Sequence, residues 1–142
     1  MSAPRKVVVI GAGPAGYVCA IRLAQLGQEV TVVEREYLGG VCLNVGCIPS
    51  KALIAAGSLM HKIARAGAMG IQVDGVKLDL AKLVAWKAGI VDKLTGGVGV
   101  LLKKNGVTVV WGSARLADKN TVVVAGEKGE QTLHADDIVI AT

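Results

Sequence analysis

Two cysteines five positions apart carry the most reactive chemistry in this chain. Cys42 and Cys47 lie in the stretch G-G-V-C-L-N-V-G-C-I-P-S-K. In an ideal helix this spacing separates the Cα atoms by roughly 8 to 9 Å, whereas a disulfide needs less than about 7 Å. The segment must therefore leave ideal helical geometry if the pair closes, and Gly46 gives the backbone freedom to do so. Lys51 follows Cys47 by one helical turn, so it can share that helix face and favour the thiolate form.

Three interpretations of the cysteine pair are open. The sequence favours a redox-active disulfide. A metal site would need further ligands, and neither His61 nor His134 has a supporting spacing. The pair could also be two reduced structural thiols. The third cysteine, Cys19, lies among apolar neighbours in a predicted helix, and we expect it to be a buried core thiol.

A G-x-G-x-x-G motif at positions 11–16 predicts nucleotide binding because of its surroundings. It follows an apolar, β-branched run and opens an Ala-rich helix, and Glu34 ends the next strand 18 positions after Gly16. Gly11 permits the tight turn, Gly13 lets the backbone approach a pyrophosphate, and Gly16 lets the helix pack closely on the sheet. The helix N-terminus offers free N–H groups to the anion, and Glu34 is placed to accept hydrogen bonds from ribose hydroxyls. The motif alone does not separate NAD from FAD.

The elements that position these residues follow from the pattern of apolar runs. Residues 6–10 and 30–34 read as buried strands joined by a helix over 15–26, which predicts a parallel sheet with a right-handed crossover. A long helix begins within 42–51 and reaches about residue 65, with Pro49 in or near its first turn. After a short loop around 67–75, a second long helix covers 79–104, with a bend or close packing expected at the Gly96-Gly97 pair.

The last third of the chain has shorter, strand-like runs. We predict a strand over 107–111, an antiparallel meander from 114–116, 121–124 and 131–133, and a further strand over 138–140. The expected fold class is α/β, a Rossmann-like domain with a parallel sheet and a small antiparallel β-meander.

Composition excludes several classes. The chain has 142 residues, 52% hydrophobic and 19% charged, which suits one domain and excludes intrinsic disorder. The net charge of +5 is spread over the chain, so we expect solvated helix faces and no nucleic-acid partner. The longest uncharged stretch, 7–21, is too short for a membrane span, so we expect no membrane partner. An odd cysteine count and no recognisable secretory leader predict a cytoplasmic protein, or a processed one in the mitochondrial matrix.

Three motifs together resemble the FAD-dependent pyridine nucleotide-disulfide oxidoreductases. They are V-V-V-I-G-A-G-P-A-G-Y, V-V-E-R and L-G-G-V-C-L-N-V-G-C-I-P-S-K-A-L, and the resemblance covers nearly the whole chain. Within the family, the cysteine motif is most similar to members that oxidise dihydrolipoyl groups with NAD+. Members that reduce glutathione or trypanothione typically have Lys where this chain has Ser50. The alternatives are a glutathione- or mercuric-reductase-like member, or a non-catalytic FAD- or ADP-binding piece.

The resemblance implies a role for each matching residue. Cys47 would be the flavin-proximal thiolate, Cys42 the thiol that exchanges with the substrate, and Lys51 would lie near flavin N5. Many relatives have Thr where this chain has Val41. The implied cofactor-binding positions are Gly11, Gly13, Pro14, Ala15, Gly16, Glu34, Arg35, Gly39, Gly40, Val41, Cys42, Cys47, Lys51, Ala114, Ala141 and Thr142.

The resemblance also implies a larger protein. Because family enzymes are several times longer, we expect 1–142 to be the N-terminal part of an FAD-binding domain, with 39–51 as its redox segment. The nicotinamide-binding and dimer-interface domains would lie outside it, and this stretch alone would be inactive. The implied cofactor is FAD, and the second substrate is NAD+. The implied partners are the dihydrolipoyl group of an E2 component or of a glycine cleavage H protein, and a second subunit in a homodimer.

Overall fold

Four apolar runs form the central sheet of the computed structural model, which describes residues 3–142. The strands are β1 (Lys6–Ile10), β2 (Glu29–Glu34), β3 (Thr108–Trp111) and β7 (Asp137–Ile140). They are all parallel and lie in the order β3-β2-β1-β7. Val8 pairs with Thr31 on one side and with Ile138 on the other. The predicted strands are confirmed to within one residue at each end.

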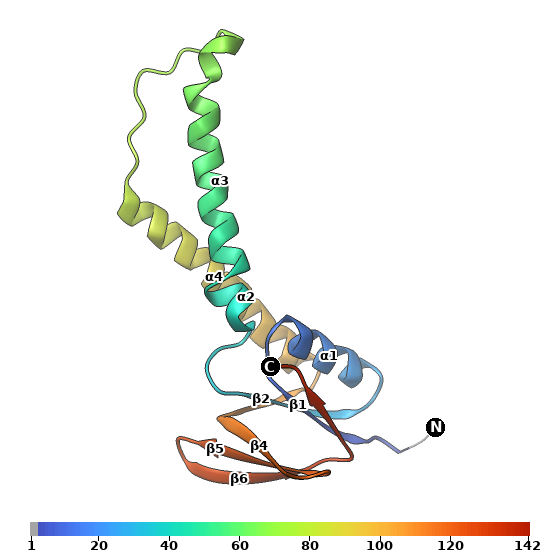
Figure 1. Cartoon of the computed structure of the whole chain (residues 1–142). Coiled ribbons are helices and arrows are strands. Elements are labelled where there is room, and N and C mark those ends of the chain that lie inside the picture. Colours follow the sequence, from blue (N-terminus) through green and yellow to red (C-terminus); the bar gives the residue numbers. More distant parts are fainter. Residues whose placement is uncertain (1–2) are drawn as a thin grey trace.

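The sheet is covered on both faces, which explains the unbroken valine run of β1. Helices α1 (Pro14–Gln25) and α4 (Leu80–Lys104) cover one face, and the antiparallel meander β4 (Ser113–Asp118), β5 (Thr121–Gly126) and β6 (Gly129–His134) covers the other (Figure 1). Val7 and Val9 belong to a buried cluster with Leu102 of α4. Val8 belongs to a second cluster with Val122 of β5. Alternate side chains of one strand therefore hold the two layers to the sheet.

Helix α4 begins and ends close to its predicted bounds. The Asp79 carboxylate caps it by accepting a hydrogen bond from the Lys82 backbone N–H at 3.0 Å. Close packing is not found at the glycine pair itself, because a Cβ atom at Gly96 or Gly97 would meet nothing within 4 Å. Helix α4 is continuous through the pair, and the bend stays a prediction. The close approach lies at Gly99, where the Leu38 side chain would be 3.4 Å from the added Cβ.

The redox segment forms two helices rather than one. Helix α2 (Gly40–Asn44) is followed by α3 (Cys47–Ala64), and the break lies at Val45 and Gly46. Gly46 has φ −109° and ψ −104°, which is outside helical geometry. Pro49 is buried in the first turn of α3, as predicted. The break turns the chain between the two cysteines.

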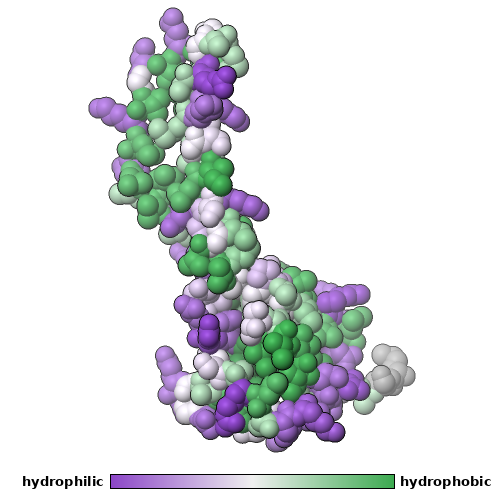
Figure 2. All heavy atoms as spheres, in the orientation of Figure 1, coloured by the Kyte–Doolittle hydropathy of each residue, from purple (hydrophilic) through white to green (hydrophobic). Residues whose placement is uncertain are grey.

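The outer parts of α3 and α4, with the residues between them, extend from the body as an arm, residues 53–90 (Figure 1). The connection is longer than the predicted loop and includes a 3₁₀ turn, η1 (Ala66–Met69). Figure 2 shows apolar residues exposed along this arm. The large ones are Leu53, Ile54, Leu59, Met60, Met69, Ile71, Val73, Val76, Leu78, Leu80, Val84 and Trp86.

One stretch, Gly40–Ala64, is long and apolar enough to cross a membrane, judged by length and composition. It is interrupted at Gly46, and α3 alone has 18 residues, or about 27 Å of helix. That length falls short of a hydrocarbon core about 30 Å thick. The expectation of no membrane partner therefore stays a prediction.

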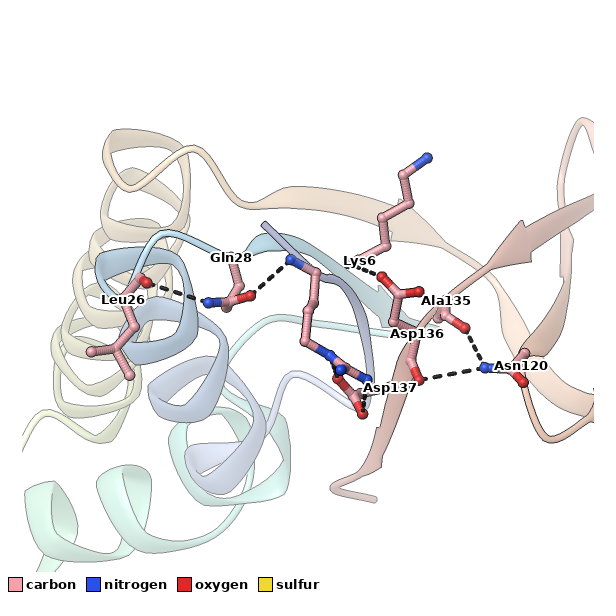
Figure 3. Close-up of polar contacts among 8 residues, drawn as sticks. Lys6, Leu26, Gln28, Asn120, Ala135, Asp136 and Asp137 are labelled. Carbon is pink, nitrogen blue, oxygen red and sulfur yellow. Dashed lines mark hydrogen bonds and ion pairs between the residues drawn. The ribbon is translucent and has the colours of Figure 1, made fainter. Parts of the chain in front are cut away.

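A polar clasp joins β7 to the beginning of β1 (Figure 3). The Arg5 guanidinium donates to both carboxylate oxygens of Asp137, at 2.6 and 3.0 Å. The Lys6 N–H donates to the Asp136 carboxylate, and the Asp136 N–H donates to the Lys6 carbonyl, both at 2.8 Å. Asn120 donates to the Ala135 carbonyl and so connects the meander to the same corner. These bonds fix the register of β7 against β1.

Candidate nucleotide and redox site

A cavity of about 460 Å³ opens at the carboxyl ends of the parallel strands. In open α/β sheets this edge is where ligands bind, next to the point at which the chain passes to the other side of the first strand. Here β2 and β7 flank β1, and the residues that follow all three strands line the cavity. The lining residues are Ile10, Gly11, Gly13, Pro14, Ala15, Val33, Glu34, Arg35, Glu36, Tyr37, Gly40, Val41, Cys42, Gly112, Ser113, Ala114, Ala141 and Thr142.

The glycine loop has the geometry that its motif predicts. Gly11 has φ +99°, and its N–H donates to the Val33 carbonyl at 2.8 Å. A side chain at Gly16 would collide with the Gly11 carbonyl, so only glycine lets α1 start this close to the sheet. Within residues 3–142, the N–H groups of Ala15 and Gly16 have no hydrogen-bond acceptor.

A second helix N-terminus faces the first. A Cβ atom at Gly40, the first residue of α2, would lie 2.8 Å from the Gly13 Cα. The backbones of Gly13 and Gly40 therefore approach each other closely, and both residues line the cavity. Such bare backbone with free N–H groups is a cradle for a pyrophosphate, because nothing bulkier stands between the anion and the donors. The residues present fit a dinucleotide cofactor.

Glu34 has a structural role that the sequence did not indicate. Its Oε2 accepts from the Ala12 N–H at 2.7 Å, and its Oε1 accepts from the N–H groups of Arg35 and Glu36 at 2.8 and 2.9 Å. The carboxylate thus ties the glycine loop to the end of β2. Oε2 accepts a single protein hydrogen bond and can take a second, so contact with a ribose hydroxyl stays a prediction.

The two cysteines of the redox segment are joined as a disulfide, with their Cα atoms 4.7 Å apart. The break between α2 and α3 brings them within the range that a disulfide needs. Cys42 is half-buried and lines the cavity, whereas Cys47 is exposed and does not. Lys51 is exposed on α3 one turn beyond Cys47 and also lies outside the lining. The separate roles of the two sulfurs and of Lys51 stay predictions.

Most predicted cofactor positions share this one cavity. The exceptions are Cys47 and Lys51, together with Gly16 and Gly39, which are buried behind its wall. Sequence reasoning did not predict six further lining residues, which are Ile10, Val33, Glu36, Tyr37, Gly112 and Ser113. All six lie near the carboxyl end of β1, β2 or β3, so their place at this edge of the sheet was the available indication.

The remaining candidates lie apart from the cavity. Cys19 is half-buried rather than fully buried, which corrects the expectation of a core thiol, because α1 turns that face partly toward solvent. His61 lies 3.5 Å from an Arg65 nitrogen, and His134 lies 3.4 Å from the Thr121 hydroxyl. Among residues 3–142, no three His, Cys, Asp or Glu side chains come together as a metal site would require.

The family model for pyridine nucleotide-disulphide oxidoreductases matches residues 5–142. The chain belongs to this family. The chain is also similar to the dihydrolipoyl dehydrogenase of Bacillus subtilis, 56% identical over 135 residues, and to that of Geobacillus stearothermophilus, 53% identical over 137 residues. These alignments cover 95% and 96% of this chain and 29% of each relative. This chain therefore spans about 29% of the length of the relatives it matches.

A solved structure agrees with the fold. The HOCl-induced flavoprotein disulfide reductase RclA from Escherichia coli, in its Cu(II) complex, matches with a TM-score of 0.78 at 26% identity. The match covers 99% of this chain and 29% of that one. The family, the α/β fold and the redox disulfide are thus consistent with one another.

Proposed function

We propose that this chain is the FAD-binding, redox-disulfide part of a dihydrolipoyl dehydrogenase, which oxidises dihydrolipoyl groups and reduces NAD+. The observation that carries the proposal is the Cys42–Cys47 disulfide beside a cavity that is lined by Cys42 and by the glycine loop. The identity of 56% to a relative of that name supports the choice of substrate within the family.

The adenosine and pyrophosphate parts of FAD would lie along the cavity. The N–H groups of Ala15 and Gly16 would bind the pyrophosphate, and the Glu34 Oε2 would accept from the ribose. Ala114 would line the adenine end, and Ala141 and Thr142 would approach the cofactor from β7. When bound, FAD supplies the two-electron chemistry that links a dithiol to NAD+.

The cysteine pair exchanges with the substrate by two thiol displacements. A dihydrolipoyl thiolate attacks the Cys42 sulfur, the Cys42–Cys47 bond breaks, and Cys47 leaves as a thiolate. The second dihydrolipoyl thiol then attacks the substrate sulfur of this mixed disulfide. Lipoyl disulfide is released, Cys42 leaves as a thiolate, and the two substrate protons are set free. The substrate has lost two electrons, and the cysteine pair holds them as two thiolates. Lys51, one turn beyond Cys47, would stabilise the thiolate by its charge.

The proposal extends to the partners and the location of the whole protein. Its dihydrolipoyl substrate would be carried by an E2 component or a glycine cleavage H protein, and the full-length protein would act as a cytoplasmic homodimer. The 142-residue chain by itself would bind FAD weakly and would not turn over.

The test is NADH formation by the purified full-length protein supplied with dihydrolipoamide and NAD+. We expect dihydrolipoamide-dependent NADH production that is lost in both Cys42→Ser and Cys47→Ser. The matched control is Cys19→Ser, which should keep the activity because Cys19 lies outside the cavity. Equal or faster turnover with glutathione disulfide and NADPH would contradict the substrate assignment.

A further inference from the structure

Asn44 is the last residue of α2, and its side chain bonds to backbone that precedes it in the chain. Its Nδ2 donates to the Leu38 carbonyl and to the Gly40 carbonyl, each at 2.9 Å. The amide has two N–H groups, and both are used. The residue is half-buried and lies between the two cysteines in the sequence.

The carbonyls that Asn44 binds belong to the turn that leads into α2. In this turn Gly39 and Gly40 have φ +85° and +57°. The Gly39 N–H donates to the Ala12 carbonyl at 2.8 Å, which joins the turn to the glycine loop. Asn44 therefore ties the redox segment to the backbone that forms the cavity wall.

Helix α2 is anchored at more than one point. It has five residues, and so short a helix is unstable without tertiary contacts. Leu43 is buried in the hydrophobic core, and Cys42, in the middle of the helix, is joined to α3 by its disulfide with Cys47. Reduction breaks this link, whereas the packing of Leu43 and the two hydrogen bonds of Asn44 do not involve sulfur and remain. The position of the turn and of Cys42 then depends on these two anchors.

We propose that Asn44 is a positioning residue that keeps Cys42 and the cavity wall in place in the dithiol state. The inference rests on the proposed function in that the pair must cycle between disulfide and dithiol. The loss of Asn44 weakens the ordered segment in both states, but only the reduced segment, freed of the disulfide, can relax into other conformations. The loss therefore costs the dithiol less than the disulfide. The structure thus assigns to Asn44 an influence on the redox equilibrium of a cysteine pair that it does not touch.

The experiment compares Asn44→Ala with Asn105→Ala in the full-length protein. Asn105 is a matched control, because its Nδ2 also donates to a carbonyl four residues earlier, that of Leu101 at 2.8 Å, at the C-terminal end of α4. Hydrogen exchange of 38–47 is measured with the pair oxidised and again in excess dithiothreitol. We expect Asn44→Ala to speed exchange about tenfold more in the reduced protein than in the oxidised one. Asn105→Ala should leave the segment unchanged in both states.

A redox titration of the cysteine pair against dithiothreitol gives the second readout. We expect Asn44→Ala to shift the equilibrium toward the dithiol about tenfold, or about 30 mV to less negative potential. Equal acceleration of exchange in both states, an unchanged potential, or a variant that cannot fold even when oxidised would each overturn the proposal. Neither readout uses dihydrolipoamide, so a protein that fails to oxidise that substrate can still confirm the role of Asn44.

Discussion

The Glu34 carboxylate shows how one side chain can shape a binding loop before any ligand arrives. It accepts hydrogen bonds from the backbone N–H groups of Ala12, Arg35 and Glu36. A backbone N–H that loses its partner in a half-buried site retains the cost of its desolvation. Glu34 therefore stabilises the glycine loop and the end of β2 together, in addition to any contact with a ribose.

Replacing Glu34 by Gln is expected to lower stability by about 1–3 kcal/mol. Gln has one acceptor oxygen in place of two, so at least one of the three N–H groups is left unpaired. The thermal midpoint of the full-length protein should fall by a few degrees. Glu36→Gln is the control, since the Glu36 side chain makes no hydrogen bond within residues 3–142. Equal midpoints for the two variants would contradict this role.

At the scale of elements, the approach of α2 to α1 requires glycine at one particular position. Gly40 has φ +57°, and its added Cβ would meet the Gly13 backbone at 2.8 Å. Gly40→Ala should cost about 1–2 kcal/mol for the left-handed backbone alone, and the clash should widen the pyrophosphate cradle. We expect weaker FAD retention, measured as flavin content after gel filtration.

A glycine-to-alanine substitution at another position should raise stability instead of lowering it. Gly57 lies inside α3 with helical backbone and open space around it. Gly57→Ala should raise stability by about 0.5–1 kcal/mol, because alanine loses less conformational freedom on folding. It should leave flavin content unchanged. If Gly57→Ala lost as much flavin as Gly40→Ala, the loss in Gly40→Ala could not be attributed to the pyrophosphate cradle.

The turn between β4 and β5 predicts a dependence on pH. The Asn120 N–H donates to the Asp118 carboxylate at 2.8 Å, and this bond, with a further one from Thr121, holds the pKa of Asp118 below its ordinary value of 3.8. A lowered pKa stabilises the folded state above pH 3.8, and this contribution is lost as the pH falls through the folded pKa. Asp118→Asn should remove it.

The measurement is the thermal midpoint between pH 2 and pH 6. The difference between the native protein and Asp118→Asn should be largest at pH 6 and should shrink as the pH falls below about 4. Asp74→Asn, in the exposed connection between α3 and α4, should show no such trend. A difference that is constant across the range would refute a titrating Asp118 as its cause.

The elements could be predicted from the sequence where one physical rule dominates. The β1 residues from Val7 to Ile10 are all apolar because both faces are covered, and the caps Gly27 and Asp79 mark helix ends. The break at Gly46 was predicted only as a condition for disulfide closure, because its position depends on the pairing of α2 with the glycine loop. The hydrogen bonds from the side chains of Glu34 and Asn44 to the backbone could not be predicted, since they depend on turns that no local pattern specifies.

At the scale of the whole molecule, many of the exposed large apolar side chains lie on the arm. They occur along both of its helices and at the 3₁₀ turn, with Trp86 51% exposed and Met69 71%, and Figure 2 shows apolar residues along the arm. The faces of the sheet, in contrast, are covered by its two layers, and the clasp joins β7 to β1 at its amino edge (Figure 3).

The clasp predicts how β7 is held. Arg5 and Asp137 are 132 positions apart, and β7 pairs with β1 along its length. The hydrogen bond to Asp137 and the charge of its carboxylate raise the pKa of Arg5. Asp137→Asn removes the charge and one acceptor. We expect faster hydrogen exchange in β7, because the strand loses the contact that holds its first residue. At its other end the Ala141 N–H donates to the Ile10 carbonyl at 2.8 Å.

Two comparisons make the effect of the clasp specific. The amides of β5 should exchange as before, because that strand is held by β4 and β6 on either side. Glu130→Gln is the matched control, since it removes an exposed ion pair with Arg115, at 3.9 Å, that lies within the meander. It should not accelerate β7. Because Ala141 and Thr142 line the cavity at the end of β7, loosening this strand in Asp137→Asn should also lower flavin content. Unchanged exchange in β7 would mean that its pairing with β1 suffices to hold the cavity wall.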